Sequence, residues 1–333
     1  MRITLELLLK IANDFVTQRC QTERDVVAVY LQGSLLREHP TIGGTTDIDL
    51  FFLHADAIRE EREFVRITDE IHLDVSHHPV SLYRRAKELR LHPWLGPAID
   101  GCKILYDPQH FLDFTRASVR GQFDRPDHVL SRARPQAEHA RQIWLGFQSE
   151  QSEAGPHEIT TYLRALDHAA NAVASLSGPP LTERRFLIDF PERAVKVNHP
   201  GLYAGLFGLL GGPLIDAPKL RSWLSDWRSA YEAASQDQPI LRLHPYRLNY
   251  YLSAFEALVE SERFQVVLWP LWRTWTHAVD VLPPHASHLP AWQSAGESLG
   301  MLGNAFRERL AALDVFLDLI DETLEAWARE NGA

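Results

Sequence analysis

The first 110 residues combine helical and strand patterns of apolar residues. An opening helix is predicted from residues that recur at helical spacing, namely Leu5, Leu8, Leu9, Ala12 and Val16. Continuous or alternating apolar runs predict four strands, at residues 26–33, 46–53, 62–68 and 71–79. Short helices are expected at 81–90 and 93–100, before a brief extended segment at 103–108. This order of elements indicates a small α/β domain with a mixed sheet.

From about residue 125 the strand patterns stop and helical periodicity replaces them. Three helices are predicted within 126–148, 157–178 and 217–235. A last helix is predicted by an apolar seam with alternating four- and three-residue spacing, formed by Phe306, Leu310, Leu313, Leu317, Ile320, Leu324 and Trp327. The seam is interpreted as bundle core, with a dimerisation coiled coil as the alternative. We therefore predict an α/β N-terminal domain over 1–124, followed by an all-α helical bundle domain over 125–333.

Composition narrows the classes of protein that fit this layout. The 333 residues carry a formal net charge of −10, whereas extended nucleic-acid binding usually needs a basic surface, so no nucleic-acid partner is expected. The two cysteines, Cys20 and Cys102, are far apart and indicate neither a disulfide framework nor a structural zinc site. No secretion signal and no run of about 18 apolar residues is found, so we expect a cytoplasmic protein without a membrane partner.

Two aspartates stand one residue apart in the second predicted strand. Asp47 and Asp49 share one face of that strand, while Ile48 and Leu50 point to the other face. Adjacent carboxylates repel unless a cation compensates them, and Mg²⁺ prefers such hard oxygen ligands. Asp74 lies on the polar face of a later strand. Three carboxylates from two strands can hold two metal ions for phosphoryl transfer.

A Gly-Ser pair precedes the aspartates and suggests a phosphate site. Gly33 ends the first strand and Ser34 would open a short helix, whose free N–H groups and hydroxyl can bind phosphate oxygens. Arg37, one helical turn later, supplies a cation. The segment TIGGTT, residues 41–46, then turns the chain tightly into the aspartate strand.

This ordered set resembles the nucleotidyltransferase superfamily that includes DNA polymerase beta, kanamycin nucleotidyltransferase and small bacterial antitoxins. The shared signature is a strand, Gly-Ser, a gap, Asp-x-Asp and a third Asp, here Gly33, Ser34, Asp47, Asp49 and Asp74. The resemblance covers about residues 25–110. Thr46 stands where many bacterial members have Ser, and Glu38 stands where many have Gly.

The resemblance implies a Mg²⁺-dependent enzyme that moves a nucleoside monophosphate, AMP by preference, from a nucleoside triphosphate to an acceptor hydroxyl. Asp47 and Asp49 would bind two Mg²⁺ ions, and Asp74 would bind the ion nearer the acceptor and help to deprotonate it. Gly33, Ser34, Arg37 and Thr46 would bind the nucleotide. Two alternatives stay open, namely solvated polar positions at an ordinary turn and a domain that has lost catalysis.

An α/β domain followed by a helical bundle is the layout of the antibiotic nucleotidyltransferases, in which a small acceptor binds between the domains. By that resemblance, Tyr162, Asp167 and His168 are candidates for acceptor binding, with Arg164 as a further one. Arg184 and Arg185 are candidate phosphate contacts. In each case the alternative is an exposed charged position on a helix. A zinc site of His72, Asp74 and His78 is also conceivable.

Three functions compete at this level. The first is nucleotidyl transfer to a small molecule, possible in a monomer or a homodimer. The second is adenylylation of a partner protein, as in toxin–antitoxin pairs, although such relatives are much shorter than this chain. The third is a non-catalytic nucleotide-binding module.

Overall fold

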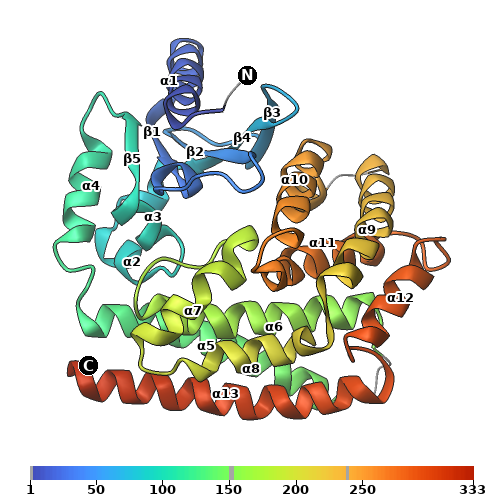
Figure 1. The fold of residues 1–333 in the computed structure, drawn as a ribbon. Helices are drawn as coiled ribbons and strands as arrows, with labels where there is room; N and C mark the ends of the chain where they lie inside the picture. Colours follow the sequence, from blue (N-terminus) through green and yellow to red (C-terminus); the bar gives the residue numbers. More distant parts are fainter. Residues whose placement is uncertain (1–2, 150–153, 238–239) are drawn as a thin grey trace. The chain divides into compact units, whose positions relative to one another are not determined.

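The computed structural model describes residues 3–149, 154–237 and 240–333. The chain divides into two compact units, Met1–His128 and Val129–Ala333 (Figure 1). The division falls in the first turn of helix α5, Pro126–Ser149, close to the predicted boundary after residue 124.

The first unit is an α/β structure whose strands follow the predicted order. Its strands are β1 (Val26–Gln32), β2 (Thr46–His54), β3 (Arg62–Arg66), β4 (Ile71–Pro79) and β5 (Lys103–Tyr106). Its α-helices are α1 (Leu5–Thr22), α2 (Ala86–Leu91), α3 (Leu95–Gly101) and α4 (Phe111–Arg120). Two single turns of 3-10 helix, η1 (Gly33–Leu36) and η2 (Val80–Tyr83), complete the described elements. Helix α4 was not predicted, whereas the other helices and all the strands were.

The described strands form one mixed sheet in the order β3-β4-β2-β1-β5. Strands β2 and β4 are parallel neighbours, and the other three pairings are antiparallel. In the parallel register, Asp49 lies opposite Asp74 and Asp47 lies opposite His72. The predicted mixed sheet is confirmed, and its central parallel pair brings the third aspartate beside the first two.

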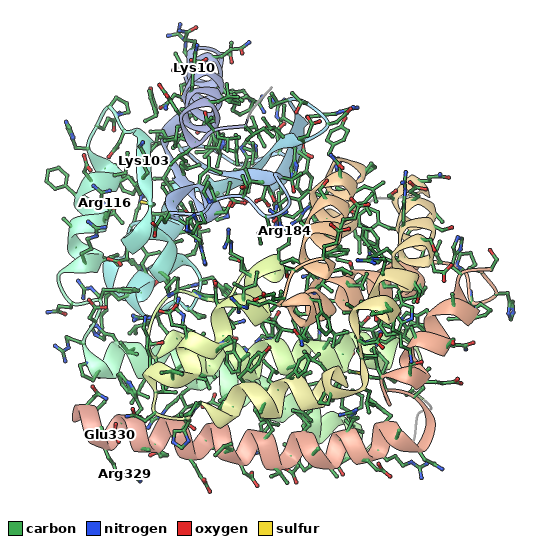
Figure 2. All side chains as sticks on the ribbon, in the orientation of Figure 1. Lys10, Lys103, Arg116, Arg184, Arg329 and Glu330 are labelled. Carbon is green, nitrogen blue, oxygen red and sulfur yellow. The ribbon has the colours of Figure 1, made fainter. Side chains whose placement is uncertain are left out.

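The two faces of this sheet bury different residues. Helix α1 covers one face with Leu8, Ala12 and Val16, which join a core containing Ile48 and Leu50. The outer side of α1 is polar, as Lys10 shows in Figure 2. A separate core on the other face includes residues of β1, β2 and helices α2 to α4. Alternation along β2 therefore places Asp47 and Asp49 on the face opposite α1.

All regular elements in the described part of the second unit are helical, as predicted. Its α-helices are α5 from Val129 onward, α6 (Pro156–Ser175), α7 (Phe186–Lys196), α8 (Gly201–Leu209), α9 (Ala217–Asp237), α10 (Leu248–Val259), α11 (Leu268–Val281), α12 (Leu289–Ser298) and α13 (Gly303–Asn331). Short 3-10 turns connect them: η3 (Glu183–Arg185), η4 (Gly212–Leu214), η5 (Leu241–Leu243), η6 (Pro245–Arg247) and η7 (Phe264–Val267).

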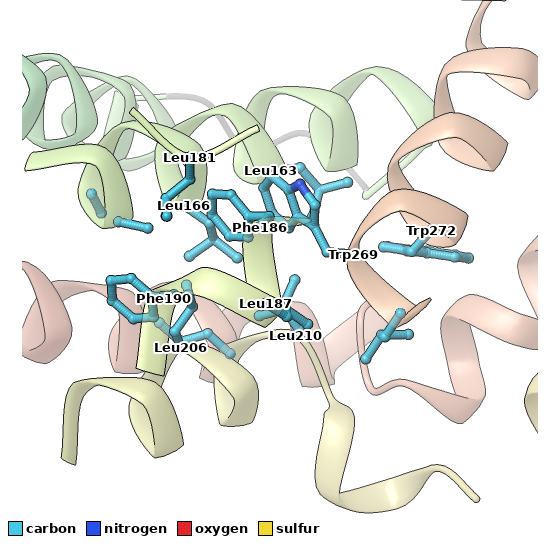
Figure 3. Close-up of a cluster of buried hydrophobic side chains, with 14 of the residues drawn as sticks. Leu163, Leu166, Leu181, Phe186, Leu187, Phe190, Leu206, Leu210, Trp269 and Trp272 are labelled. Carbon is cyan, nitrogen blue, oxygen red and sulfur yellow. The ribbon is translucent and has the colours of Figure 1, made fainter. Parts of the chain in front are cut away.

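Helices α6 and α11 supply the centre of this bundle. Phe186 and Trp269 stack face to face with ring centroids 3.8 Å apart (Figure 3). The buried indoles continue along α11 through Trp272 and Trp275. Trp227 of α9 is also buried, and its Nε1 donates to the Thr274 hydroxyl at 2.9 Å. These four tryptophans are therefore core residues, as the sequence indicated.

The C-terminal helix α13 buries its apolar seam within its own unit. Phe306, Leu313 and Leu317 belong to the bundle core, whereas Arg329 and Glu330 are exposed (Figure 2). The intramolecular interpretation of the seam is thus confirmed. None of the helices in the described part of the chain combines the length and apolar character that a membrane span requires.

Candidate metal centre and phosphate-binding turn

The three predicted aspartates converge on one point of the sheet. Carboxylate oxygens of Asp47, Asp49 and Asp74 all lie within 4.8 Å of one another. Asp47 and Asp49 are two residues apart on β2, and Asp74 is the register partner of Asp49 on β4. Their side chains meet because alternate residues of a strand share a face and parallel neighbours keep that face in common.

This carboxylate cluster is nearly buried, so its negative charge is costly without a cation. Asp47 and Asp74 are 6% and 3% exposed, and Asp49 is half-buried. Three hard oxygen donors at this spacing fit Mg²⁺, which binds through carboxylates and retains water. The donor set therefore fits the metal that the sequence implied.

Asp74 has a second partner that the sequence did not predict. Arg62 of β3 donates from Nε to Oδ1 at 2.6 Å and from Nη2 to Oδ2 at 2.5 Å. A carboxylate has about four lone-pair positions, so this two-pronged pairing leaves Asp74 able to bind a metal as well. Sequence reasoning missed Arg62 because β3 pairs with β4 through a register that only the folded sheet defines.

Gly33 is required at its position for two independent reasons. Its φ is +87°, a left-handed value that favours glycine. A Cβ atom there would lie 1.8 Å from Oδ2 of Asp49. The backbone of the turn after β1 therefore lies against the carboxylate cluster, and a larger residue would force the Asp49 carboxylate to move.

Ser34 and Thr46 lie in contact beside this turn. Their hydroxyl oxygens are 2.7 Å apart, in hydrogen-bonding distance. Thr46 is fully buried and directly precedes Asp47, whereas Ser34 is half-buried. Arg37, also half-buried, follows η1, and its backbone N–H donates to the Ser34 carbonyl at 3.0 Å. The structure thus groups the four predicted nucleotide-binding residues around one turn.

The predicted tight turn before β2 is present. Ile42 and Thr45 exchange both backbone hydrogen bonds at 3.2 Å across Gly43 and Gly44. Both glycines have positive φ, +60° and +74°, as the two central residues of a tight hairpin require. This turn delivers the chain to Thr46 and fixes where the aspartates begin.

The predicted acceptor-binding residues of α6 are placed differently from one another. Tyr162 is fully buried, and its hydroxyl donates to the Leu209 carbonyl at 3.0 Å. A side chain without exposed surface cannot contact a dissolved acceptor, so that role is not open to Tyr162 in this conformation. Asp167 pairs with Arg273 at 2.7 Å, and His168 Nδ1 lies 2.6 Å from the Gln136 amide oxygen. Burial lowers the pKa of His168, which favours its neutral form. Arg164 is exposed.

The second unit also contains a partly buried charge network that the sequence did not indicate. Glu183 forms an ion pair with Arg242 at 2.8 Å and accepts a hydrogen bond from the Tyr251 hydroxyl at 2.6 Å. Burial acts to raise the pKa of Glu183, but the charges of Arg242 and Arg273 outweigh it and hold the pKa at about 2. Glu183 is therefore ionised at neutral pH.

Arg184, the residue after Glu183, lies inside the second unit rather than on its surface. It is 4% exposed, and its Nη1 donates to the Tyr250 carbonyl at 2.8 Å. Its guanidinium carbon lies 3.4 Å from the centroid of the Tyr250 ring. The exposed position considered for Arg184 is thus wrong, while its neighbour Arg185 is half-buried.

Among the described residues, no metal-compatible group of three or more side chains includes His72 or His78. His78 Nδ1 instead lies 2.5 Å from the Tyr83 hydroxyl. The alternative zinc site of His72, Asp74 and His78 is therefore not formed.

The chain matches no protein-family model, and no curated protein matches it.

Proposed function

We propose that this protein is a Mg²⁺-dependent nucleotidyltransferase that transfers a nucleoside monophosphate, AMP by preference, from a nucleoside triphosphate to a hydroxyl of a small-molecule acceptor. The observation that carries the proposal is the carboxylate cluster of Asp47, Asp49 and Asp74 within 4.8 Å, directly beside the Gly33 turn. Acids alone would support many metal sites. A glycine turn with a hydroxyl and a guanidinium directly beside them favours a phosphate-containing substrate.

The three aspartates Asp47, Asp49 and Asp74 would hold Mg²⁺. The metal would supply positive charge that offsets the charge of the triphosphate and of the leaving pyrophosphate. Arg62 keeps Asp74 in place through its two hydrogen bonds. The Asp74 carboxylate is thereby oriented before any substrate arrives.

The residues of the turn would bind the β- and γ-phosphates. Ser34 offers a hydroxyl that is already positioned by Thr46, and Arg37 offers a guanidinium on the same turn. Because Gly33 has no side chain, the phosphates can approach the backbone closely. These contacts fix the α-phosphate next to the aspartates.

The reaction forms one bond and breaks one. The acceptor oxygen attacks the α-phosphorus, the bond from that phosphorus to the bridging oxygen breaks, and pyrophosphate leaves with the electron pair. The acceptor hydroxyl loses its proton, which Asp74 can take up through a lone pair that Arg62 does not occupy. We assign acceptor recognition to the helical unit, with Asp167 and His168 as the proposed contacts.

Calorimetric titration tests the donor half of this proposal. ATP, GTP, CTP and UTP would each be titrated with and without Mg²⁺ into the full chain and into Asp47→Asn/Asp49→Asn. Asp56→Asn/Asp69→Asn is the matched control, because it removes the same charge from exposed positions. We expect one preferred nucleotide whose binding needs Mg²⁺, is lost in the first variant and is kept in the control.

Turnover tests the other half. Pyrophosphate release would be followed while hydroxyl-bearing small molecules are screened with the preferred nucleotide. Equal nucleotide binding by the wild type and Asp47→Asn/Asp49→Asn would contradict the assignment of the site. Metal-dependent binding without turnover on any acceptor would favour the non-catalytic module, and turnover only on a protein would favour adenylylation of a partner.

A further inference from the structure

A second group of ionisable side chains lies in the first unit, on the α1 face of the sheet. His54 ends β2 and His77 lies near the end of β4, whereas the aspartate cluster lies near the beginning of both strands on the opposite face. The two imidazoles are 6% and 9% exposed. They line a pocket of about 660 Å³ together with the end of α1 and the loop between β2 and β3.

The two histidines are joined in one chain of hydrogen bonds that begins and ends on a carboxylate. His54 Nδ1 lies 2.8 Å from Asp25 Oδ2, and His77 Nε2 lies 3.2 Å from Glu63 Oε1. Between the rings, His54 Nε2 lies 2.8 Å from His77 Nδ1. Arg19 pairs with the Glu63 carboxylate.

The protons of this chain can be assigned from its two ends. A carboxylate only accepts, so His54 must carry a proton on Nδ1 and His77 must carry one on Nε2. The hydrogen bond from His77, acting with Arg19 against burial, lowers the pKa of Glu63, which keeps it ionised. The other two nitrogens, His54 Nε2 and His77 Nδ1, face each other at 2.8 Å. They are close enough to bind one cation together.

Each histidine has the environment of a metal ligand. Metal-binding histidines almost always donate their second ring N–H to a carboxylate or carbonyl, which fixes the tautomer and aims the other nitrogen at the metal. His54 with Asp25 and His77 with Glu63 both follow this arrangement. In the described wall of the pocket, five carboxylates face three arginines, an excess of two negative charges that favours a cation.

We propose that His54 and His77 form a binding site for a divalent transition-metal ion of the class that imidazole prefers, such as Zn²⁺ or Ni²⁺. Two nitrogen ligands at 2.0–2.1 Å in tetrahedral geometry are about 3.3 Å apart, so the rings must separate by about half an ångström and turn so that both nitrogens face the metal. The open pocket supplies the remaining positions with water. The site is independent of the aspartate cluster.

Calorimetry with the metal alone tests this site. ZnCl₂ and, separately, NiCl₂ would be titrated into the full chain near neutral pH. We expect a site that keeps its affinity in excess Mg²⁺. The site should be lost in His54→Ala/His77→Ala and retained in His78→Ala, which removes a neighbouring histidine on the opposite face of β4.

Asp25→Asn and Glu63→Gln provide a second test that keeps both imidazoles and the shapes of their partners. Each should weaken Zn²⁺ binding by about 10–100-fold, the usual effect of removing a carboxylate behind a histidine ligand. Identical isotherms for the wild type and the two-histidine variant would overturn the proposal. Unchanged affinity in both carboxylate variants would overturn it as well.

Discussion

Arg62 of strand β3 donates two hydrogen bonds to the Asp74 carboxylate, of 2.6 and 2.5 Å. Asp74 is 3% exposed, so the guanidinium is the main compensation for a buried charge in the absence of metal. The same guanidinium opposes metal binding, because it lowers the negative potential of the cluster.

Arg62→Gln should therefore change stability and metal response in opposite directions. We expect the metal-free protein to lose about 1–3 kcal/mol, since a buried carboxylate loses its partner. The rise in melting temperature on adding Mg²⁺ should become larger than in the wild type. Arg66→Gln, on the same strand but in an exposed pair with Asp69, is the control and should alter neither. A smaller Mg²⁺ effect in Arg62→Gln would contradict this view of the pair.

Gly33→Ala separates backbone strain from the collision with Asp49. Gly44→Ala has a similar positive φ but meets no atom within 4 Å, so it should cost only about 1–2 kcal/mol. Gly33→Ala adds the clash with the carboxylate and should be less stable and bind Mg²⁺ more weakly. Thermal unfolding and Mg²⁺ titration of the two variants measure both effects. Equal stability and equal Mg²⁺ affinity of the two alanine variants would show that the close approach of Gly33 to Asp49 affects neither property.

Ser34→Ala should weaken nucleotide binding without affecting Mg²⁺ binding measured alone. The lost hydroxyl removes one hydrogen bond to a charged phosphate, which corresponds to about tenfold in affinity. Ser81→Ala, at an exposed position of η2, serves as the control. If Ser34→Ala lowered Mg²⁺ affinity as much as nucleotide affinity, the turn would support the aspartates rather than the phosphates.

The low pKa of Glu183 predicts that the free energy of unfolding of the helical unit falls as the pH becomes acidic. Its folded pKa of about 2 lies below the ordinary value of 4.5, so the unfolded chain binds its proton first as the pH falls. The stabilisation is complete above pH 4.5 and is lost towards pH 2, about 3 kcal/mol in all. Glu183→Gln should be less stable at neutral pH by a similar amount, because Arg242 loses its partner.

Urea unfolding between pH 2 and 7 measures this contribution. The stability of Glu183→Gln should change less than that of the wild type between pH 4.5 and 2. Parallel pH profiles for the two proteins would mean that Glu183 does not contribute through its charge.

The sequence by itself determined the strands, the helical class of the second part and the order of the candidate site residues. Period-two alternation placed Asp47 and Asp49 on one face, and positional preferences of glycine placed the turns at Gly33 and at Gly43-Gly44. These are local properties, because a strand or a tight turn depends on residues close together in the chain. The apolar seam of α13 was predictable for the same reason.

Tertiary structure alone decided which distant residues share an environment. The sheet register brought Arg62 to Asp74 and His54 to His77, neither of which adjacent residues can specify. Packing of the helices likewise buried Tyr162 in the core. It also placed Glu183 beside Arg242 and Arg273, whose charges lower its pKa. Register and burial depend on how many segments pack at once, and this physical reason puts them beyond a reading of local pattern.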